Sequence, residues 1–182
     1  MKNLNLGCGK DYREGWINTD FNKDIKADVY INFNEPLPFK DNEIDYILLD
    51  NVLEHITPER YMTFIEDLHR ICKQGSIIEI YVPHYSGMYA LKHPTHYKCF
   101  GIGSFDTFIN ESRFNGERYS KARFKVISER LLFFHHNLDG MKILSKLPIN
   151  GLFNLSRKWQ LLMERFQFFG FDETVFKLEV VK

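Results

Sequence analysis

Short runs of apolar and β-favouring residues, each closed by a polar side chain, dominate the first part of the chain. Their spacing and composition predict strands at residues 3–6, 16–20, 28–33 and 44–50. Pro36 and Pro38 break regular structure between the third and the fourth run. The pattern therefore places four strands before residue 51.

A helix is predicted directly after the fourth strand. Thr57 and Pro58 suit the N-cap and the first helical position. Apolar residues then recur along one helical stripe, at Tyr61, Phe64, Ile65, Leu68 and Cys72. Gly75 is the expected end of this helix, and a fifth strand is expected over residues 76–82. The order strand, helix, strand predicts a βαβ unit and a largely parallel sheet.

The rest of the chain shows a weaker pattern. Residues 124–134 and 173–181 are strand-like, and residues 152–169 have helical character. No internal repeat and no low-complexity tract is present in the sequence. Because 182 residues is close to the length of one average domain, we expect a single domain over residues 1–182.

Charged and aromatic residues divide the chain into two parts. The formal net charge is zero, yet residues 1–112 hold 11 Lys/Arg and 17 Asp/Glu, whereas residues 113–182 hold 13 and 7. Of the 17 Phe residues, 13 lie from Phe100 onward. A chain without net positive charge is not typical of nucleic-acid-binding proteins, and no motif of that class is present. The basic, aromatic second part instead suits an anionic acceptor or partner.

The cysteines and the N-terminus indicate a reducing interior. Cys8, Cys72 and Cys99 are odd in number and have no C-x-x-C spacing, which argues against a disulfide framework and a structural zinc site. Gly7 interrupts the N-terminal apolar run too early for a secretory signal, and no apolar run approaches 18 residues. We therefore expect a cytoplasmic protein.

Small and polar residues follow each of the first four predicted strands. They are the glycine turn Gly7-Cys8-Gly9, then Asp20, then Asn32 and Phe33, and finally Asp50 and Asn51. Any one of them alone fits a plain turn, but ligands of open α/β sheets bind at the carboxyl ends of strands, so the set predicts one crevice. Asp20 can accept hydrogen bonds from both hydroxyls of a ribose. Asn32 and Phe33 offer an amide for the edge of an adenine and a ring for its face.

These residues and their neighbours resemble a known family. The resemblance is carried by residues 4–9, 16–20, 37–45, 51–56 and 75–84. They resemble class I S-adenosylmethionine-dependent methyltransferases over roughly the first 110 residues. The resemblance implies an α/β fold with a doubly wound, mostly parallel Rossmann-like sheet whose last strand is antiparallel. Residues 1–112 would then bind the cofactor, and residues 113–182 would complete the sheet and the substrate side.

By this resemblance, S-adenosylmethionine would bind across the strand ends. The methionine moiety would lie against Asn5 and the turn Gly7-Cys8-Gly9, the ribose against Asp20, the adenine against Asn32 and Phe33, and the sulfonium near Asp50 and Asn51. Glu54 and His55 match the structural signature that follows the fourth strand of the family, and they are given an architectural role.

The chain also departs from the family. Asn5 stands where an acid is usual, and Lys10 stands where a third glycine is common. Only nine residues separate Leu6 from Trp16, fewer than the dozen that a crossover helix normally needs, so the first helix is expected to be reduced or absent. The same shortening argues against a nicotinamide-dependent oxidoreductase, because Tyr12 stands where G-x-G-x-x-G has its third glycine.

Histidines gather after the fifth predicted strand. Imidazole titrates near neutral pH, and the Pro-His and His-Pro-Thr-His runs recur at this place in the family subset that the chain resembles, so His84, His93 and His96 are the candidates for acceptor contact or proton removal. Turn capping by His93 and His96 is an open alternative. A metal site built from all three histidines is another, although their spacing matches no familiar ligand pattern and no metal ligand is assigned.

Together these features predict a methyltransferase that acts on a hydroxyl or an amine of a small-molecule, sugar or lipid-linked acceptor. The amphipathic, basic residues 152–169 fit either core packing or contact with a membrane surface or an anionic acceptor, and a homodimer stays open. Two alternatives remain at this stage: a non-catalytic partner subunit that binds S-adenosylmethionine, and a nicotinamide-dependent oxidoreductase.

Overall fold

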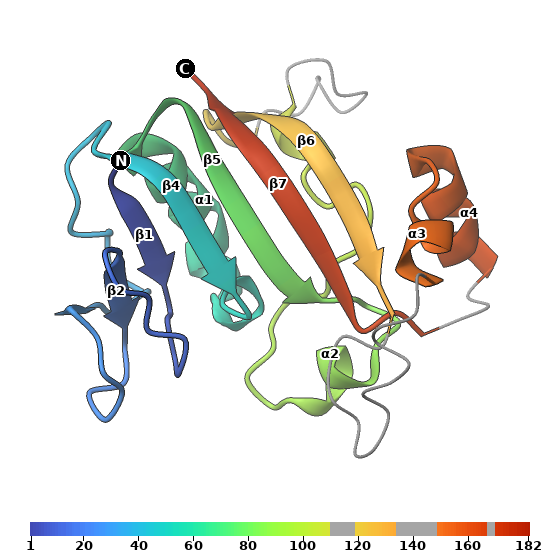
Figure 1. Ribbon diagram of the computed structural model, residues 1–182, viewed down its shortest axis with the longest axis horizontal. Helices are drawn as coiled ribbons and strands as arrows, with labels where there is room; N and C mark the ends of the chain where they lie inside the picture. The colour runs from blue at the N-terminus through green and yellow to red at the C-terminus, as the bar shows by residue number, and fades with distance from the viewer. Residues whose placement is uncertain (110–118, 134–148, 167–169) are drawn as a thin grey trace.

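One seven-stranded sheet connects the two parts of the chain. The computed structural model describes residues 1–109, 119–133, 149–166 and 170–182. The strands of the sheet are β1 (Asn3–Leu6), β2 (Ile17–Asp20), β3 (Val29–Tyr30), β4 (Ile44–Asp50), β5 (Cys72–Pro83), β6 (Arg123–Leu132) and β7 (Glu173–Val181). Their spatial order is β3-β2-β1-β4-β5-β7-β6 (Figure 1).

Parallel and antiparallel strands occupy separate parts of this sheet. Neighbouring strands from β3 to β5 are parallel, with Leu6 of β1 opposite Thr19 of β2 and Leu49 of β4. β7 is antiparallel to both β5 and β6. The expected α/β fold with a mostly parallel sheet and an antiparallel last strand is therefore confirmed.

The helix after the fourth strand begins as predicted but ends earlier. α1 spans Pro58–Ile71, with Thr57 at the N-cap position, and its buried stripe includes Phe64 and Leu68. The expected end at Gly75 is wrong, because β5 already starts at Cys72. Cys72 pairs with Ile44, whereas Ile77 pairs with Tyr46, so β5 bulges between them. Gly75 takes a left-handed φ of 77° inside this bulge, which glycine adopts without strain.

Two other elements also differ from their predicted bounds. The third strand is only two residues long instead of covering residues 28–33, because the chain turns away at Asn32. The predicted helical stretch 152–169 consists of two helices, α3 (Ile149–Phe153) and α4 (Arg157–Phe166), and residues 167–169 lie outside the described residues. Phe134, the predicted end of a strand, also lies outside them.

Helices cover one face of the sheet among the described residues. α1 packs behind the sheet in the view of Figure 1. Right-handed crossovers after β1 and β2 would run over the opposite face, but residues 7–16 and 21–28 contain no helix. The expected loss of the first helix is thus confirmed, and the second helical layer of a doubly wound fold is not formed in these crossovers. β5 shows the consequence, because Ile78 and Ile80 are buried while the alternate residues are half exposed.

Short helices lie beyond the carboxyl ends of the central strands. They are η1 (Leu53–His55) after β4 and α2 (Met88–Lys92) after β5, whereas η2 (Asp106–Phe108) packs against the sheet, with the ring of Phe108 edge-on to Phe124 of β6. Figure 1 shows α2 below the ends of β4 and β5, whereas α3 and α4 lie beside β6. No helix in the described part of the chain has the length and apolar character to span a membrane.

Candidate functional site

The strand register brings the predicted site residues to one edge of the sheet. Leu6, Thr19 and Leu49 lie side by side on three neighbouring strands. The residues that follow them, Gly7, Asp20 and Asp50, therefore leave the sheet at the same edge. The sequence prediction of one crevice rested on this arrangement of parallel strands.

The glycine turn needs both of its glycines for backbone reasons. Gly7 and Gly9 have φ angles of 75° and 50°, in the left-handed region that favours glycine. A Cβ on Gly7 would also lie 2.5 Å from Cγ2 of Val52, whereas a Cβ on Gly9 would meet open space. The turn is held by the amides of Gly7 and Cys8, which both donate to the carbonyl of Thr19 at 2.8 Å. The open side of Gly9 is a place where a ligand can approach the backbone.

Asp20 connects the end of β2 to this turn. Its Oδ2 accepts a hydrogen bond from the amide of Gly9 at 2.8 Å, and its Oδ1 accepts one from the amide of Asn22 at 2.9 Å. The carboxylate is thereby fixed beside the glycine turn although Asp20 is only 6% exposed. Each carboxylate oxygen has a further lone pair, so both can also accept a hydrogen bond from a ribose hydroxyl.

Asn5 and the Cys8 side chain support the turn from within. Asn5 is buried, and its Nδ2 donates to the carbonyl of Asp11 at 2.7 Å and to Oδ1 of Asn18 at 3.3 Å. The Cys8 thiol is also buried and lies 3.6 Å from the carbonyl of Lys26. Burial raises the pKa of this thiol, and the nearby charge of Asp20 raises it further. Asn5 therefore ties the two sides of the shortened crossover together, and Cys8 can face a ligand only through its backbone.

The chain after β3 carries Asn32 and Phe33, the residues expected at the adenine. Oδ1 of Asn32 accepts from the amide of Asn34 at 3.1 Å, which makes a side-chain turn at an exposed position. The ring of Phe33 packs edge-on against Phe64 of α1, with 6.2 Å between the centroids. It also lies 3.7 Å from the position of a Cβ on Gly7. Phe33 thus lies between α1 and the glycine turn.

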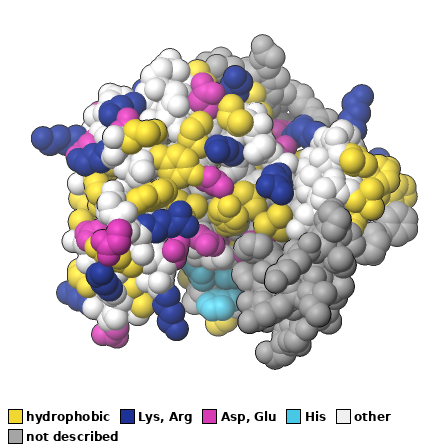
Figure 2. Space-filling view, viewed as in Figure 1, with side chains coloured by type: hydrophobic (Ala, Val, Ile, Leu, Met, Phe, Trp, Pro, Cys, Tyr) yellow, Lys and Arg dark blue, Asp and Glu magenta, His cyan; other side chains and the backbone are white. Residues whose placement is uncertain are grey.

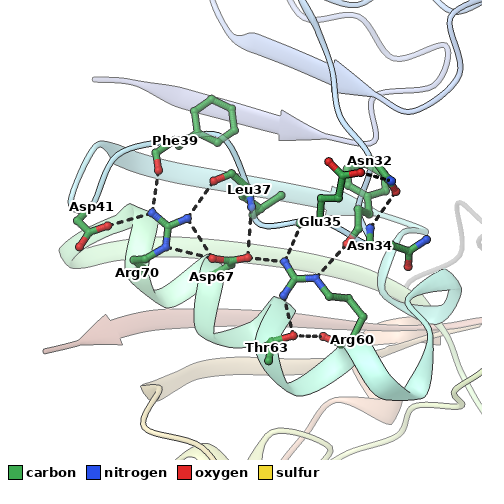
Figure 3. A network of polar contacts seen from close by, with 11 residues as sticks. Asn32, Asn34, Glu35, Leu37, Phe39, Asp41, Arg60, Thr63, Asp67 and Arg70 are labelled. Atoms are coloured by element: carbon green, nitrogen blue, oxygen red, sulfur yellow. Dashed lines mark hydrogen bonds and ion pairs between the residues drawn. The ribbon is translucent and has the colours of Figure 1, made fainter.

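Two arginines of α1 hold this same segment in place (Figure 3). Arg60 donates to the carbonyl of Glu35 at 2.9 Å, and Arg70 donates to the carbonyl of Leu37 at 2.9 Å. Asp67 lies between them, paired with Arg60 and with Arg70 at 3.0 Å, and it accepts from the amide of Leu37 at 3.2 Å. This network was not predicted from the sequence. The sequence feature that could have indicated it is the placement of Arg60, Asp67 and Arg70 on one side of a helix whose other side packs on the sheet.

A group of acidic residues lies at the ends of β4 and β7. Nδ2 of Asn51 donates to Asp50 at 2.8 Å and to Glu173 at 3.4 Å. Glu54 is fully buried, and neither of its carboxyl oxygens has a hydrogen-bond partner among the described residues. Burial raises the pKa of Glu54 to about 8, and the charges of Asp50 and Glu173 contribute in the same direction. Glu54 therefore holds a proton at neutral pH beside the site, in addition to the architectural role that the sequence suggested.

The structure places His84 apart from the other two candidate histidines. Its ring is fully buried, and its Nδ1 accepts a hydrogen bond from the amide of Ser86 at 3.1 Å. Because that nitrogen accepts, Nε2 carries the proton and donates to Glu164 of α4 at 2.8 Å. The same carboxylate oxygen accepts from the amide of Ile102 at 2.7 Å. His84 thus connects the end of β5 to α4.

His93 and His96 lie together, and His55 joins them. One ring nitrogen from each of these three histidines lies within 4.8 Å of the others. The segment after α2 is fixed over η1, because the amide of Tyr97 donates to the carbonyl of Glu54 at 2.8 Å. Burial lowers the pKa of His55 and of His96, and the interactions with neighbouring histidines lower both further. His84 was predicted from the sequence to lie with His93 and His96, whereas the fold brings His55 there instead.

Comparison with known proteins agrees with this geometry. Residues 4–80 match a family described as a methyltransferase domain. A comparison with curated protein sequences gives no match.

Solved structures extend the likeness over nearly the whole chain. An S-adenosylmethionine-dependent methyltransferase from Archaeoglobus fulgidus shares 20% identity, with a TM-score of 0.58 over 98% of this chain and 85% of that chain. The YcgJ protein of Bacillus subtilis shares 13% identity, with a TM-score of 0.58 over 100% and 92%. A complex between the Haloferax volcanii Trm112 methyltransferase activator and a methyltransferase gives 14% identity and a TM-score of 0.58 over 99% and 82%. Residues 4–80 are therefore similar to a methyltransferase domain, and the solved structures show that nearly the whole chain shares their fold.

Proposed function

We propose that this chain binds S-adenosylmethionine at the carboxyl ends of β1, β2 and β4 and transfers its methyl group to a hydroxyl or an amine of a small-molecule, sugar or lipid-linked acceptor. The carrying observation is the pairing of the Gly9 amide with the Asp20 carboxylate at 2.8 Å. This hydrogen bond holds a carboxylate beside an open glycine turn. The carboxylate suits a ribose, and the turn suits the methionine moiety attached to it.

The chain's own residues have three tasks in such a reaction. When bound, S-adenosylmethionine supplies a methyl group on a sulfonium, which moves to the acceptor by in-line displacement. The protein mainly has to align the two partners and exclude water. Asp20 orients the ribose, Phe33 covers the adenine, and the turn at Gly7 and Gly9 lets the backbone approach the methionine moiety.

His93 and His96 are the proposed proton acceptors on the acceptor side. They follow α2, which lies beyond the ends of β4 and β5 (Figure 1). The lowered pKa of His96 keeps its imidazole neutral near pH 7, which is the form that can take a proton from an acceptor hydroxyl or ammonium group. His84 is proposed to act as a positioning residue only, because both of its ring nitrogens are engaged inside the protein.

Calorimetric titration with S-adenosylmethionine, S-adenosylhomocysteine and a nicotinamide dinucleotide tests this proposal. We expect the wild-type chain to bind the first two and not the third. Asp20→Asn keeps the size of the side chain but removes its charge, and a hydrogen bond to a charged group is worth about 1.5–3 kcal/mol. The variant should therefore lose roughly tenfold or more in affinity for S-adenosylmethionine. Asp24→Asn, at an exposed position four residues further on, is the matched control and should bind like the wild type.

The outcomes separate the alternatives. Preference for the dinucleotide would support an oxidoreductase and contradict the proposal. Binding of S-adenosylmethionine without turnover on any pool of acceptors would support a non-catalytic partner subunit. Equal affinity in wild type and Asp20→Asn would remove Asp20 from the cofactor site.

A further inference from the structure

Three histidines from two distant segments of the chain meet at one place. His55 ends η1, whereas His93 and His96 follow α2. The ring of His96 stacks on that of His93 at 4.7 Å between centroids, and the ring of His55 stands edge-on at 4.7 Å from His96 and 5.4 Å from His93. Figure 2 shows histidine side chains gathered in a recess at the lower edge of the molecule, below a group of Asp and Glu side chains.

The hydrogen bonds of these rings indicate which nitrogens carry protons. Nδ1 of His55 lies 3.2 Å from the carbonyl of Thr95, and Nδ1 of His96 lies 3.2 Å from the carbonyl of Ala90. A carbonyl oxygen only accepts, so both Nδ1 atoms carry the proton and both Nε2 atoms keep a lone pair. The Thr95 hydroxyl lies 2.8 Å from Nδ1 of His55 and 2.9 Å from Nδ1 of His93, so one side chain orients two rings.

We propose that His55, His93 and His96 form a binding site for a divalent transition metal, with zinc as the preferred ion. Neutral imidazole nitrogens are common zinc ligands, and rings whose second nitrogen donates to a carbonyl or hydroxyl are the usual outer arrangement of such sites. Tetrahedral coordination at 2.0–2.1 Å needs nitrogens about 3.4 Å apart. One ring nitrogen of each histidine already lies within 4.8 Å of the other two, and the side chain of His93, the exposed member, can close the remaining distance by a change of its torsion angles.

Three protein ligands leave one coordination position open. Structural zinc sites are closed by four protein ligands, whereas sites with three histidines keep a position for water or a substrate group. His55 lies only five residues after the end of β4, on the side of the proposed cofactor edge. When the ion is bound, the ligating nitrogens of His93 and His96 have no lone pair left for a proton, so these two histidines act as proton acceptors only in the metal-free chain. An oxygen of the methyl acceptor is the ligand expected in the open position, and this last step rests on the proposed function. Metal binding itself does not depend on it.

Metal titration tests the site without any assay of methyl transfer. The full chain is stripped with a chelator and titrated with Zn²⁺ against a chromophoric competitor, and separately with Co²⁺, whose visible spectrum reports nitrogen ligands. We expect one ion per chain. Removing a residue that hydrogen-bonds a metal ligand typically lowers metal affinity 10–100-fold, so Thr95→Val should bind Zn²⁺ more weakly by about that factor. His93→Ala removes a ligand itself and should lower the affinity at least as much. His93 is exposed, so this variant should keep its fold.

Two variants serve as matched controls. His69→Ala removes a histidine of α1 whose Nε2 is bonded to the carbonyl of Val181, and Cys99→Ser removes the exposed thiol. Both should bind metal like the wild type. Absence of Zn²⁺ and Co²⁺ binding, or equal affinity in wild type and His93→Ala, would overturn the proposal. Retained S-adenosylmethionine binding in His93→Ala would show that the metal site and the cofactor site fail independently.

Discussion

The buried carboxyl of Glu54 should make the stability of this protein fall as the pH rises. Burial raises the pKa of Glu54 from its ordinary value of 4.5 to about 8. Between these values the folded chain holds a proton that the unfolded chain releases, so the free energy of unfolding decreases with increasing pH. A tenfold change in proton affinity corresponds to about 1.4 kcal/mol, which gives a total loss of about 5 kcal/mol and about 3 kcal/mol of it by pH 7.

Glu54→Gln removes this titration while keeping the size of the side chain. The difference in unfolding free energy between the variant and the wild type should therefore grow in favour of the variant by about 3 kcal/mol from pH 4.5 to pH 7. Urea unfolding followed by tryptophan fluorescence at several pH values measures it. His55 and His96 act in the opposite direction below their ordinary pKa, because their pKa values are lowered, but they are unchanged in both proteins and cancel in the difference.

Glu59→Gln is the matched control, because Glu59 is exposed in the first turn of α1. Its curve should run parallel to that of the wild type. If the curves of Glu54→Gln and the wild type were parallel as well, the buried, unpartnered carboxyl would not exist in solution.

Three further predictions concern the support of the site. Asp67→Ala should cost about 3–5 kcal/mol in urea unfolding, because it leaves two arginines without their shared partner, and unchanged stability would contradict the network of Figure 3. Gly7→Ala should be more destabilising than Gly9→Ala in the same assay. An alanine in the left-handed conformation costs about 1–2 kcal/mol at either position, but only the Cβ at position 7 would also clash with Val52. Equal losses of unfolding free energy in the two variants would argue against that contact. Glu164→Ala should cost about 1–3 kcal/mol by removing the buried acceptor of His84, measured as a lower Tm, while leaving the affinity for S-adenosylmethionine unchanged.

Much of the fold follows from local patterns in the sequence. The strands end in polar residues, and the helical stripe from Tyr61 to Leu68 is continuous, so the parallel part of the sheet and α1 were predictable. The nine residues between Leu6 and Trp16 also sufficed to predict the missing helix. The end of α1 was predicted too late because Gly75 serves a bulge in β5, which depends on pairing with β4 across the sheet.

The candidate site was predictable only where backbone position decides it. Asp20 follows a strand end, so its place beside the glycine turn could be expected from topology. The partners of side chains could not, because they come from distant segments. His84 turns inward to Glu164, 80 residues further along the chain, while His55 joins His93 and His96 instead. The spacing of residues along the chain does not predict such contacts.

A crystal structure of the chain with S-adenosylhomocysteine tests the central claim most directly. We predict that the ribose hydroxyls lie within hydrogen-bond distance of the Asp20 carboxylate, with the adenine beside Phe33 and the amino acid end against Gly7 and Gly9. A nucleoside bound anywhere else on the chain, with the Asp20 carboxylate contacting only the amides of Gly9 and Asn22, would contradict the account.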